Sequence, residues 1–165
     1  MSEARKLAAA IRLVVFDVDG VFTDGRLFLD SNGIETHKIF HVRDGYGVKR
    51  LLAAGIEVAI ISGRDSAAVA ARMAALGVRH VFQGRDDKLP VLEALLGKLG
   101  VAPEHTAFVG DDEPDAAGLQ IGEYPGQCRE VEDVRLVDHQ GEVLARHERI
   151  VRLFPADPFF DRRNW

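Results

Sequence analysis

Two aspartates follow the first apolar run of the sequence, and their spacing suits chemistry on a charged ligand. Residues 13–16 (LVVF) are β-branched and aromatic types that fill the middle of a sheet, and Asp17 and Asp19 come next, before Gly20. Burying a carboxylate is costly unless it is paired with a cation or bound to a metal. Side chains two residues apart on an extended segment point the same way, so both carboxylates can reach one ligand. The pair therefore predicts acid–base chemistry or a site for a hard cation such as Mg²⁺.

Three more polar groups stand in comparable places. They are Ser62, Gly63 and Arg64 after the apolar run IEVAII, Lys88 at the head of a helix-like segment, and Asp111 and Asp112 after TAFVG. Phosphoryl transfer needs these types: a nucleophile, an acid, donors and a cation for the phosphoryl oxygens, and oxygen ligands for a metal. Taken singly, each group also fits a turn, a helix cap or a solvated charge. Together they favour one site.

Apolar strand-like runs alternate with helix-like segments along the first two thirds of the chain. We expect strands at residues 13–18, 56–61, 78–82 and 106–109, and helices at 48–54, 65–76 and 88–99. This order predicts an α/β fold with a Rossmann-like parallel sheet and helices on both faces. In such sheets ligands bind at the carboxyl ends of the strands, where all the polar groups above are expected.

One segment breaks the alternation. Residues 21–41 carry an apolar–polar pattern around a DSNG turn, which predicts a β-hairpin inserted after the first strand. Its apolar positions suit a contact with another subunit, or else packing on the chain's own sheet. These positions are Leu27, Leu29, Ile34 and Ile39. Residues 131–137 and 143–153 have strand or helix character, and the last residues look irregular.

Length and composition exclude several classes. A chain of 165 residues predicts one domain, and its net charge of −5 argues against a nucleic-acid surface. No apolar run approaches the roughly 18 residues of a membrane helix. Residues 1–12 lack the apolar stretch of a signal peptide. Cys128 is the single cysteine, so no internal disulfide forms, and a reducing cytoplasm is the expected location.

The motifs DVDGV, ISGR, the isolated Lys88 and GDDEPD resemble the four motifs of the haloacid dehalogenase superfamily of phosphohydrolases. The stretches DVDGVFTDG, VRDGYG and VGDD, with the hairpin, are most similar to its capless branch that dephosphorylates a small sugar acid for lipopolysaccharide. The resemblance covers about residues 12–115. It implies a Mg²⁺-dependent phosphatase acting on a small anionic sugar phosphate through an aspartyl-phosphate.

The resemblance also implies roles for single residues. Asp17 is expected to be the nucleophile, and Asp19 to protonate the leaving alcohol and later activate water. Mg²⁺ is expected to be held by the Asp17 carboxylate, the Asp19 main-chain carbonyl and Asp111, with Asp112 orienting waters or Lys88. Lys88 would neutralise Asp17 and the transferred oxygens.

The phosphoryl and sugar groups need further contacts. By the same resemblance, Ser62 would donate a hydrogen bond to the phosphoryl group. The expected substrate-binding residues are Arg43, Asp44 and Gly45 in a substrate-side loop, together with Gly63 and Arg64.

The gaps after the first and third strands are too short to hold a cap domain over the site. The resemblance implies a homotetramer in which hairpins pack together and neighbouring subunits wall the site. After Asp115 the sequence lacks the family's glycine-rich tail. Divergence and a shifted reading frame are two explanations for residues 116–165.

Other functions remain open from the residues. One is a capless phosphatase of nine-carbon, sialic-type or varied sugar phosphates. A second is a non-catalytic oligomerisation module related to nucleotide-sugar synthetases, although retention of Asp17 argues against it. A third is a phosphate-accepting receiver domain, which would lack the DxDG spacing.

Overall fold

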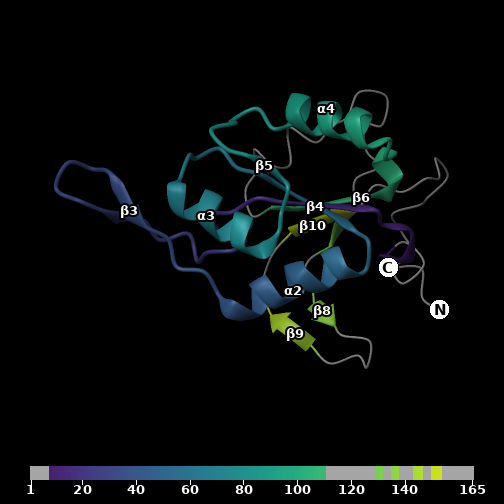
Figure 1. Ribbon diagram of the computed structural model, residues 1–165, viewed down its shortest axis with the longest axis horizontal. Coiled ribbons are helices and arrows are strands. Elements are labelled where there is room, and N and C mark those ends of the chain that lie inside the picture. The colour runs from purple at the N-terminus through teal and green to yellow at the C-terminus, as the bar shows by residue number, and fades with distance from the viewer. Residues whose placement is uncertain (1–7, 111–128, 132–134, 138–142, 147–149, 154–165) are drawn as a thin grey trace.

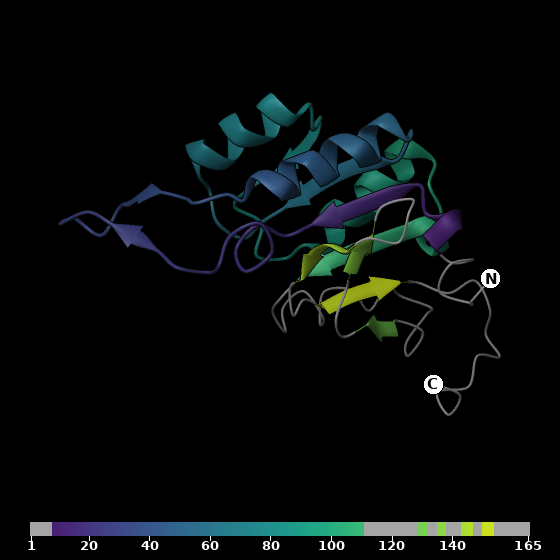
Figure 2. The same cartoon turned by 90° about the horizontal axis from the view of Figure 1, so that it is seen from below.

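The computed structural model describes residues 8–110 and four short strands after them, at 129–131, 135–137, 143–146 and 150–153. A sheet lies in the middle, with helix α4 (Leu89–Leu99) over one face and helices α2 (Val42–Ala53) and α3 (Ala67–Leu76) over the other (Figures 1 and 2). The predicted α/β class with helices on both faces is confirmed. No helix within the described ranges combines the length and apolar character needed to cross a membrane.

Four strands of the sheet are parallel: β1 (Leu13–Phe16), β4 (Glu57–Ile61), β5 (His80–Phe82) and β6 (Thr106–Gly110). The sheet continues through two antiparallel strands, β10 (Ile150–Leu153) and β7 (Arg129–Val131), in the order β5-β4-β1-β6-β10-β7. Strands β8 (Arg135–Val137) and β9 (Val143–Arg146) form a separate antiparallel pair. A 3₁₀ turn, η1 (Pro103–His105), leads into β6. The central position of β1 places residue 17 between the ends of its two neighbours.

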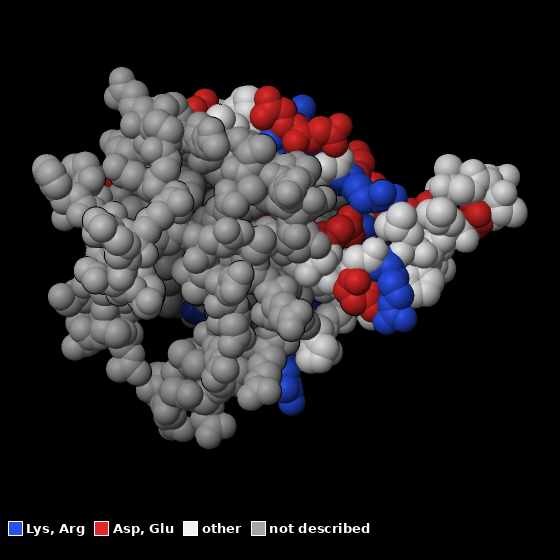
Figure 3. All heavy atoms as spheres, turned by 180° about the vertical axis from the view of Figure 1, so that it is seen from behind, with Lys and Arg blue, Asp and Glu red and all other residues white. Residues whose placement is uncertain are grey.

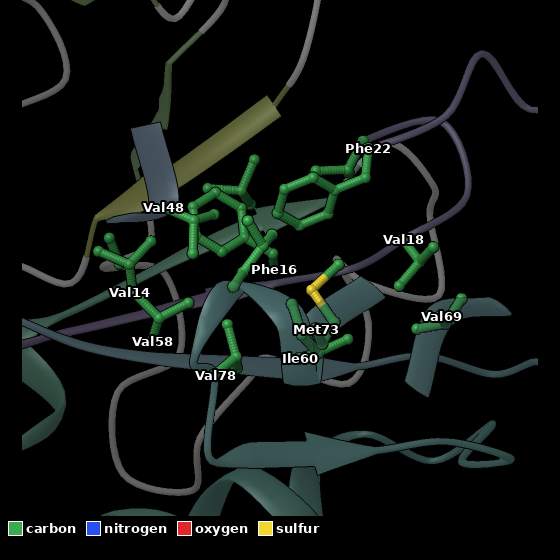
Figure 4. Close-up of a cluster of buried hydrophobic side chains, with 14 of the residues drawn as sticks. Val14, Phe16, Val18, Phe22, Val48, Val58, Ile60, Val69, Met73 and Val78 are labelled. Carbon is green, nitrogen blue, oxygen red and sulfur yellow. The ribbon is translucent and has the colours of Figure 1, made fainter. Parts of the chain in front are cut away.

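The core has one apolar cluster on each face of the sheet, because successive side chains of a strand alternate between faces. Val14 and Phe16 of β1 pack toward α2 and α3, where they meet Met73 of α3 (Figure 4). Leu13 and Val15 pack toward α4. Burying each such side chain contributes about 1.5–3 kcal/mol, and this burial fixes the register of the strand end that follows.

Helix α2 begins six residues before the predicted start at residue 48. His41 caps it, with the ring nitrogen Nδ1 accepting a hydrogen bond from the Arg43 amide at 3.1 Å. Gly45 lies inside the helix, where a Cβ atom would come within 2.3 Å of Arg72 Nη2. The Arg72 side chain of α3 therefore lies close to Gly45 of α2, and the interpretation of RDGYG as a segment before the helix was wrong.

The inserted hairpin is present, with strands β2 (Phe28–Leu29) and β3 (Glu35–His37). It projects from the body beyond the carboxyl end of β1 (Figures 1 and 2). Asp30 shapes its turn by accepting hydrogen bonds from the Ile34 and Asn32 amides, which lower the pKa of its carboxyl group. The turn closes at Gly33, whose φ of +77° disfavours other residues.

The apolar side chains of the hairpin are exposed rather than packed on the chain's own sheet. Leu27, Leu29, Ile34 and Ile39 are each between 46% and 62% exposed. The alternative of packing within the subunit was therefore wrong for these four positions. Several large apolar side chains exposed on one hairpin favour a protein–protein contact.

Candidate active site

Asp17 extends the sheet by one residue beyond β1. Its amide donates to the Val109 carbonyl of β6 at 2.9 Å, and its side chain is buried, with Oδ1 accepting a hydrogen bond from the Val18 amide at 2.7 Å. The Val18 carbonyl then accepts amide hydrogen bonds from Val21, Phe22 and Thr23. This tight turn ends the strand and holds a buried carboxylate at its tip.

Lys88 provides a cation directly beside Asp17. It is the N-cap of α4, and its Nζ lies 3.0 Å from Asp17 Oδ2. Residues 17 and 88 are 8% and 7% exposed, so the pair is screened little by water. A buried ion pair costs desolvation on both sides, which makes it weak evidence of a purely stabilising role. Sequence reasoning predicted this contact, and the structure places the two groups together.

Ser62 lies at the same edge of the sheet, after β4, on the side of β1 away from β6. The register pairs Phe16 with Ile60, so Ser62 stands one residue beyond the level of Asp17. Its amide donates to the Phe82 carbonyl and its carbonyl accepts from the Arg85 amide, which fixes the loop that leads to Lys88. Gly63 follows where a Cβ atom would come within 3.2 Å of Asp86 Oδ1.

Asp19 lies in a network of alternating charges. Lys38 Nζ lies 2.5 Å from Asp19 Oδ1 and 2.9 Å from Glu35 Oε1. Arg64 Nε lies 3.2 Å from Glu35 Oε2 and 3.9 Å from Asp19 Oδ2. Seen from behind, acidic and basic side chains adjoin one another where the hairpin joins the body (Figure 3). Sequence reasoning missed Glu35 and Lys38, because in the sequence both look like ordinary polar positions of a hairpin strand.

The predicted substrate-side loop is instead the first turn of α2. Arg43 is exposed there, whereas Asp44 is buried and its Oδ2 makes no hydrogen bond within the described part of the chain. Gly45 is covered by Arg72. Any contact of Arg43, Asp44 or Gly45 with a substrate stays a prediction.

Asp111 and Asp112 lie outside the described residues. The last residue of β6, Gly110, follows Val109, whose carbonyl is bonded to Asp17. Within residues 8–110 and the four later strands, no three His, Cys, Asp or Glu side chains gather as a metal site. Of the ligands expected from the sequence, the Asp17 carboxylate and the Asp19 carbonyl lie within the described residues, and both are hard oxygens. They fit Mg²⁺, which takes few protein ligands and keeps several waters.

Comparison with known proteins identifies the family of the chain. Residues 41–121 match the family of haloacid dehalogenase-like hydrolases. The crystal structure of the 3-deoxy-D-manno-octulosonate 8-phosphate phosphatase of Moraxella catarrhalis, in complex with magnesium, phosphate and KDO, is 45% identical. The match covers 73% of this chain and 68% of that one, with a TM-score of 0.68. The chain belongs to the haloacid dehalogenase-like hydrolases.

Other relatives are named for the same activity. The 3-deoxy-D-manno-octulosonate 8-phosphate phosphatase of Escherichia coli (strain K12) is 50% identical over 105 residues, which is 64% of this chain and 55% of that enzyme. The cobalt-bound enzyme of Haemophilus influenzae is 47% identical with a TM-score of 0.63, covering 66% of this chain and 63% of that one. The chain therefore spans about half the length of the curated relatives it matches.

The buried Asp17–Lys88 pair gives a stability prediction for this haloacid dehalogenase-like domain. Lys88→Met is expected to lower the free energy of unfolding by about 3 kcal/mol, because it removes the ammonium group that compensates the buried Asp17 carboxylate. In an Asp17→Asn background the same change should cost at least ~2 kcal/mol less, since no carboxylate then remains to be neutralised. Urea unfolding of the four proteins measures both values, with the exposed Lys98→Met as a matched control. Equal costs in the two backgrounds would show that the pair is not coupled.

Proposed function

We propose that the chain is a phosphomonoester hydrolase that converts 3-deoxy-D-manno-octulosonate 8-phosphate to 3-deoxy-D-manno-octulosonate and phosphate. The observation that carries the proposal is the buried contact of Lys88 Nζ with Asp17 Oδ2 at 3.0 Å, at the end of the central strand. It pairs a nucleophile with the cation that the transferred group would need. Relatives at 45–50% identity bear this activity in their names, which supports the choice of substrate.

The chemistry proceeds in two halves. Asp17 attacks phosphorus to form an aspartyl-phosphate while the ester P–O bond breaks, and the departing oxygen takes its proton from Asp19. A water then attacks the same phosphorus, gives its proton to Asp19, and releases phosphate and the Asp17 carboxylate. Lys88 neutralises charge on the equatorial oxygens in both halves, and Ser62 donates a hydrogen bond to one of them.

The proposed activity needs a Mg²⁺ ion, and this chain has residues that could bind it. The Asp17 carboxylate, the Asp19 carbonyl and Asp111 would hold the ion, with Asp112 behind them. When bound, the ion draws negative charge from the phosphoryl oxygens and helps to orient the group for in-line attack. The magnesium-bound and cobalt-bound relatives support a divalent ion here.

Substrate and assembly belong to the same proposal. Arg64 has a side chain about half exposed beside Asp19, where it suits a carboxylate or phosphate of an incoming sugar acid. The exposed apolar hairpin would pack against copies of itself in a homotetramer, so that neighbours wall the uncovered site. The enzyme would work in the cytoplasm, on a free small substrate rather than on nucleic acid or membrane.

A substrate panel tests the proposal. Phosphate release should give a kcat/KM for 3-deoxy-D-manno-octulosonate 8-phosphate at least tenfold above those for a sialic acid 9-phosphate and for hexose phosphates. Tenfold corresponds to about 1.4 kcal/mol in the barrier. A flatter profile would indicate a phosphatase of broad specificity. Absence of turnover with every ester, at saturating Mg²⁺, would contradict the hydrolase itself and favour a non-catalytic module.

A further inference from the structure

Lys38 is a buried lysine that none of the expected motifs uses. It follows β3 at the root of the hairpin, and its side chain is 2% exposed. An ammonium group removed from water is costly unless carboxylates compensate its charge. A lysine that serves only solubility or the turn would have no reason to be buried here.

Two carboxylates from different segments compensate this charge. Lys38 Nζ contacts Asp19 Oδ1 from the turn after β1 and Glu35 Oε1 from β3. Arg64, after β4, contacts Glu35 on its other oxygen at 3.2 Å. The four groups alternate in sign, so the side chain of Asp19 is fixed from the hairpin side.

The two oxygens of Asp19 differ. Oδ1 accepts from Lys38, with Thr23 Oγ1 3.4 Å away. Oδ2 makes no hydrogen bond to any residue in the described ranges, and the Arg64 Nε beside it is 3.9 Å away. Oδ1 is therefore anchored, whereas Oδ2 is buried and has no hydrogen-bond partner among the described residues.

We propose that Lys38, oriented by Glu35, is the positioning residue that anchors Asp19 through Oδ1, so that Oδ2 faces the leaving oxygen and carries its proton. The inference rests on the proposed function, in which Asp19 is the acid. Lys38 itself stays protonated throughout: the proton leaves Asp19 Oδ2 as the ester bond breaks and returns to it from water. Because its side chain is 2% exposed, the lysine acts through Asp19 and not by binding the phosphoryl group.

The dependence on leaving group separates this role from a general structural one. An alkoxide leaving group needs the proton from Asp19, whereas p-nitrophenolate is stable enough to depart without it. The ratio kcat/KM covers steps only up to departure of the alcohol, so it excludes the later hydrolysis, in which Asp19 also acts. Lys38→Met is expected to lower kcat/KM for the sugar phosphate by at least about 30-fold, and for p-nitrophenyl phosphate by less than about threefold.

Three further variants serve as controls: one at an exposed lysine, one that keeps the charge of Lys38, and one that keeps the net charge of the protein. Lys98 is exposed on α4, so Lys98→Met should leave kcat/KM unchanged for both the sugar phosphate and p-nitrophenyl phosphate. Lys38→Arg, which keeps charge and donors, should recover at least part of the sugar-phosphate activity. If Lys38→Met fails to fold, the double variant Glu35→Gln/Lys38→Gln replaces it, because this variant removes one positive and one negative charge together. It should show the same selective loss of kcat/KM for the sugar phosphate.

The outcomes distinguish the inference from the function beneath it. If the wild-type protein hydrolyses neither ester, the proposed function falls and this inference falls with it. Suppose instead that the wild type is active and that the Lys38 variants lose kcat/KM equally for both esters, or for neither. The proposed function then stands and the positioning role is overturned. Circular dichroism and thermal unfolding establish that each variant compared is folded.

Discussion

Asp17→Asn is expected to lower kcat by at least about a thousandfold and to leave the fold intact. The amide oxygen is a poor nucleophile, so no aspartyl-phosphate forms, and the loss of a nucleophile removes most of the rate enhancement. The side chain keeps its size and can still accept the Val18 amide hydrogen bond that ends β1. Phosphate release under saturating substrate measures the loss, and circular dichroism measures the fold.

Asp24→Asn is the matched control for this substitution. Asp24 is exposed and pairs with Arg26, which lowers the pKa of its carboxyl group. Its kcat should stay within about twofold of the wild type, as expected for a surface change. Activity of Asp17→Asn within tenfold of the wild type would end the assignment of Asp17 as nucleophile.

Removal of divalent ions is expected to have the second large effect. Chelation should lower turnover by at least about a hundredfold, because Lys88 alone cannot balance a phosphoryl group facing the Asp17 carboxylate. Readdition of Mg²⁺ should restore the rate. Undiminished turnover after exhaustive chelation would contradict metal dependence.

Thermal unfolding gives a readout of the same site that is independent of activity. An ion that binds only the folded protein stabilises it, by about 2.7 kcal/mol at an ion concentration of a hundred times the Kd. This stabilisation raises the unfolding temperature of the protein. Mg²⁺ should therefore stabilise the wild type and stabilise Asp17→Asn less, since one anionic ligand is lost. Equal shifts in both proteins would place the ion elsewhere.

Much of the fold follows from local pattern. The runs that became β1, β4 and β6 are mostly apolar, and strands buried on both faces have this composition in parallel sheets. The acidic and polar residues after them then had to meet at one edge, which is why Asp17, Ser62 and Lys88 were expected together. The glycines that end α3 and α4 in left-handed geometry, Gly77 and Gly100, were equally legible.

The misses came from tertiary contacts that no local pattern records. The start of α2 depends on a histidine cap, and Gly45 lies inside the helix beside the Arg72 side chain. Lys38 and Glu35 looked like ordinary polar positions of a hairpin strand. Their importance depends on their contacts with Asp19, which follows β1, and with Arg64, which follows β4. These contacts link three segments that are far apart in the sequence.

Trapping the covalent intermediate tests the central claim most directly. The wild-type protein is mixed with 3-deoxy-D-manno-octulosonate 8-phosphate and Mg²⁺, quenched in acid within one turnover, and digested for mass spectrometry. The account predicts one phosphoryl group, carried by the Asp17 carboxylate and absent from Asp17→Asn. A phosphoryl group on any other residue, or turnover with no phosphoenzyme at any quench time, would contradict it.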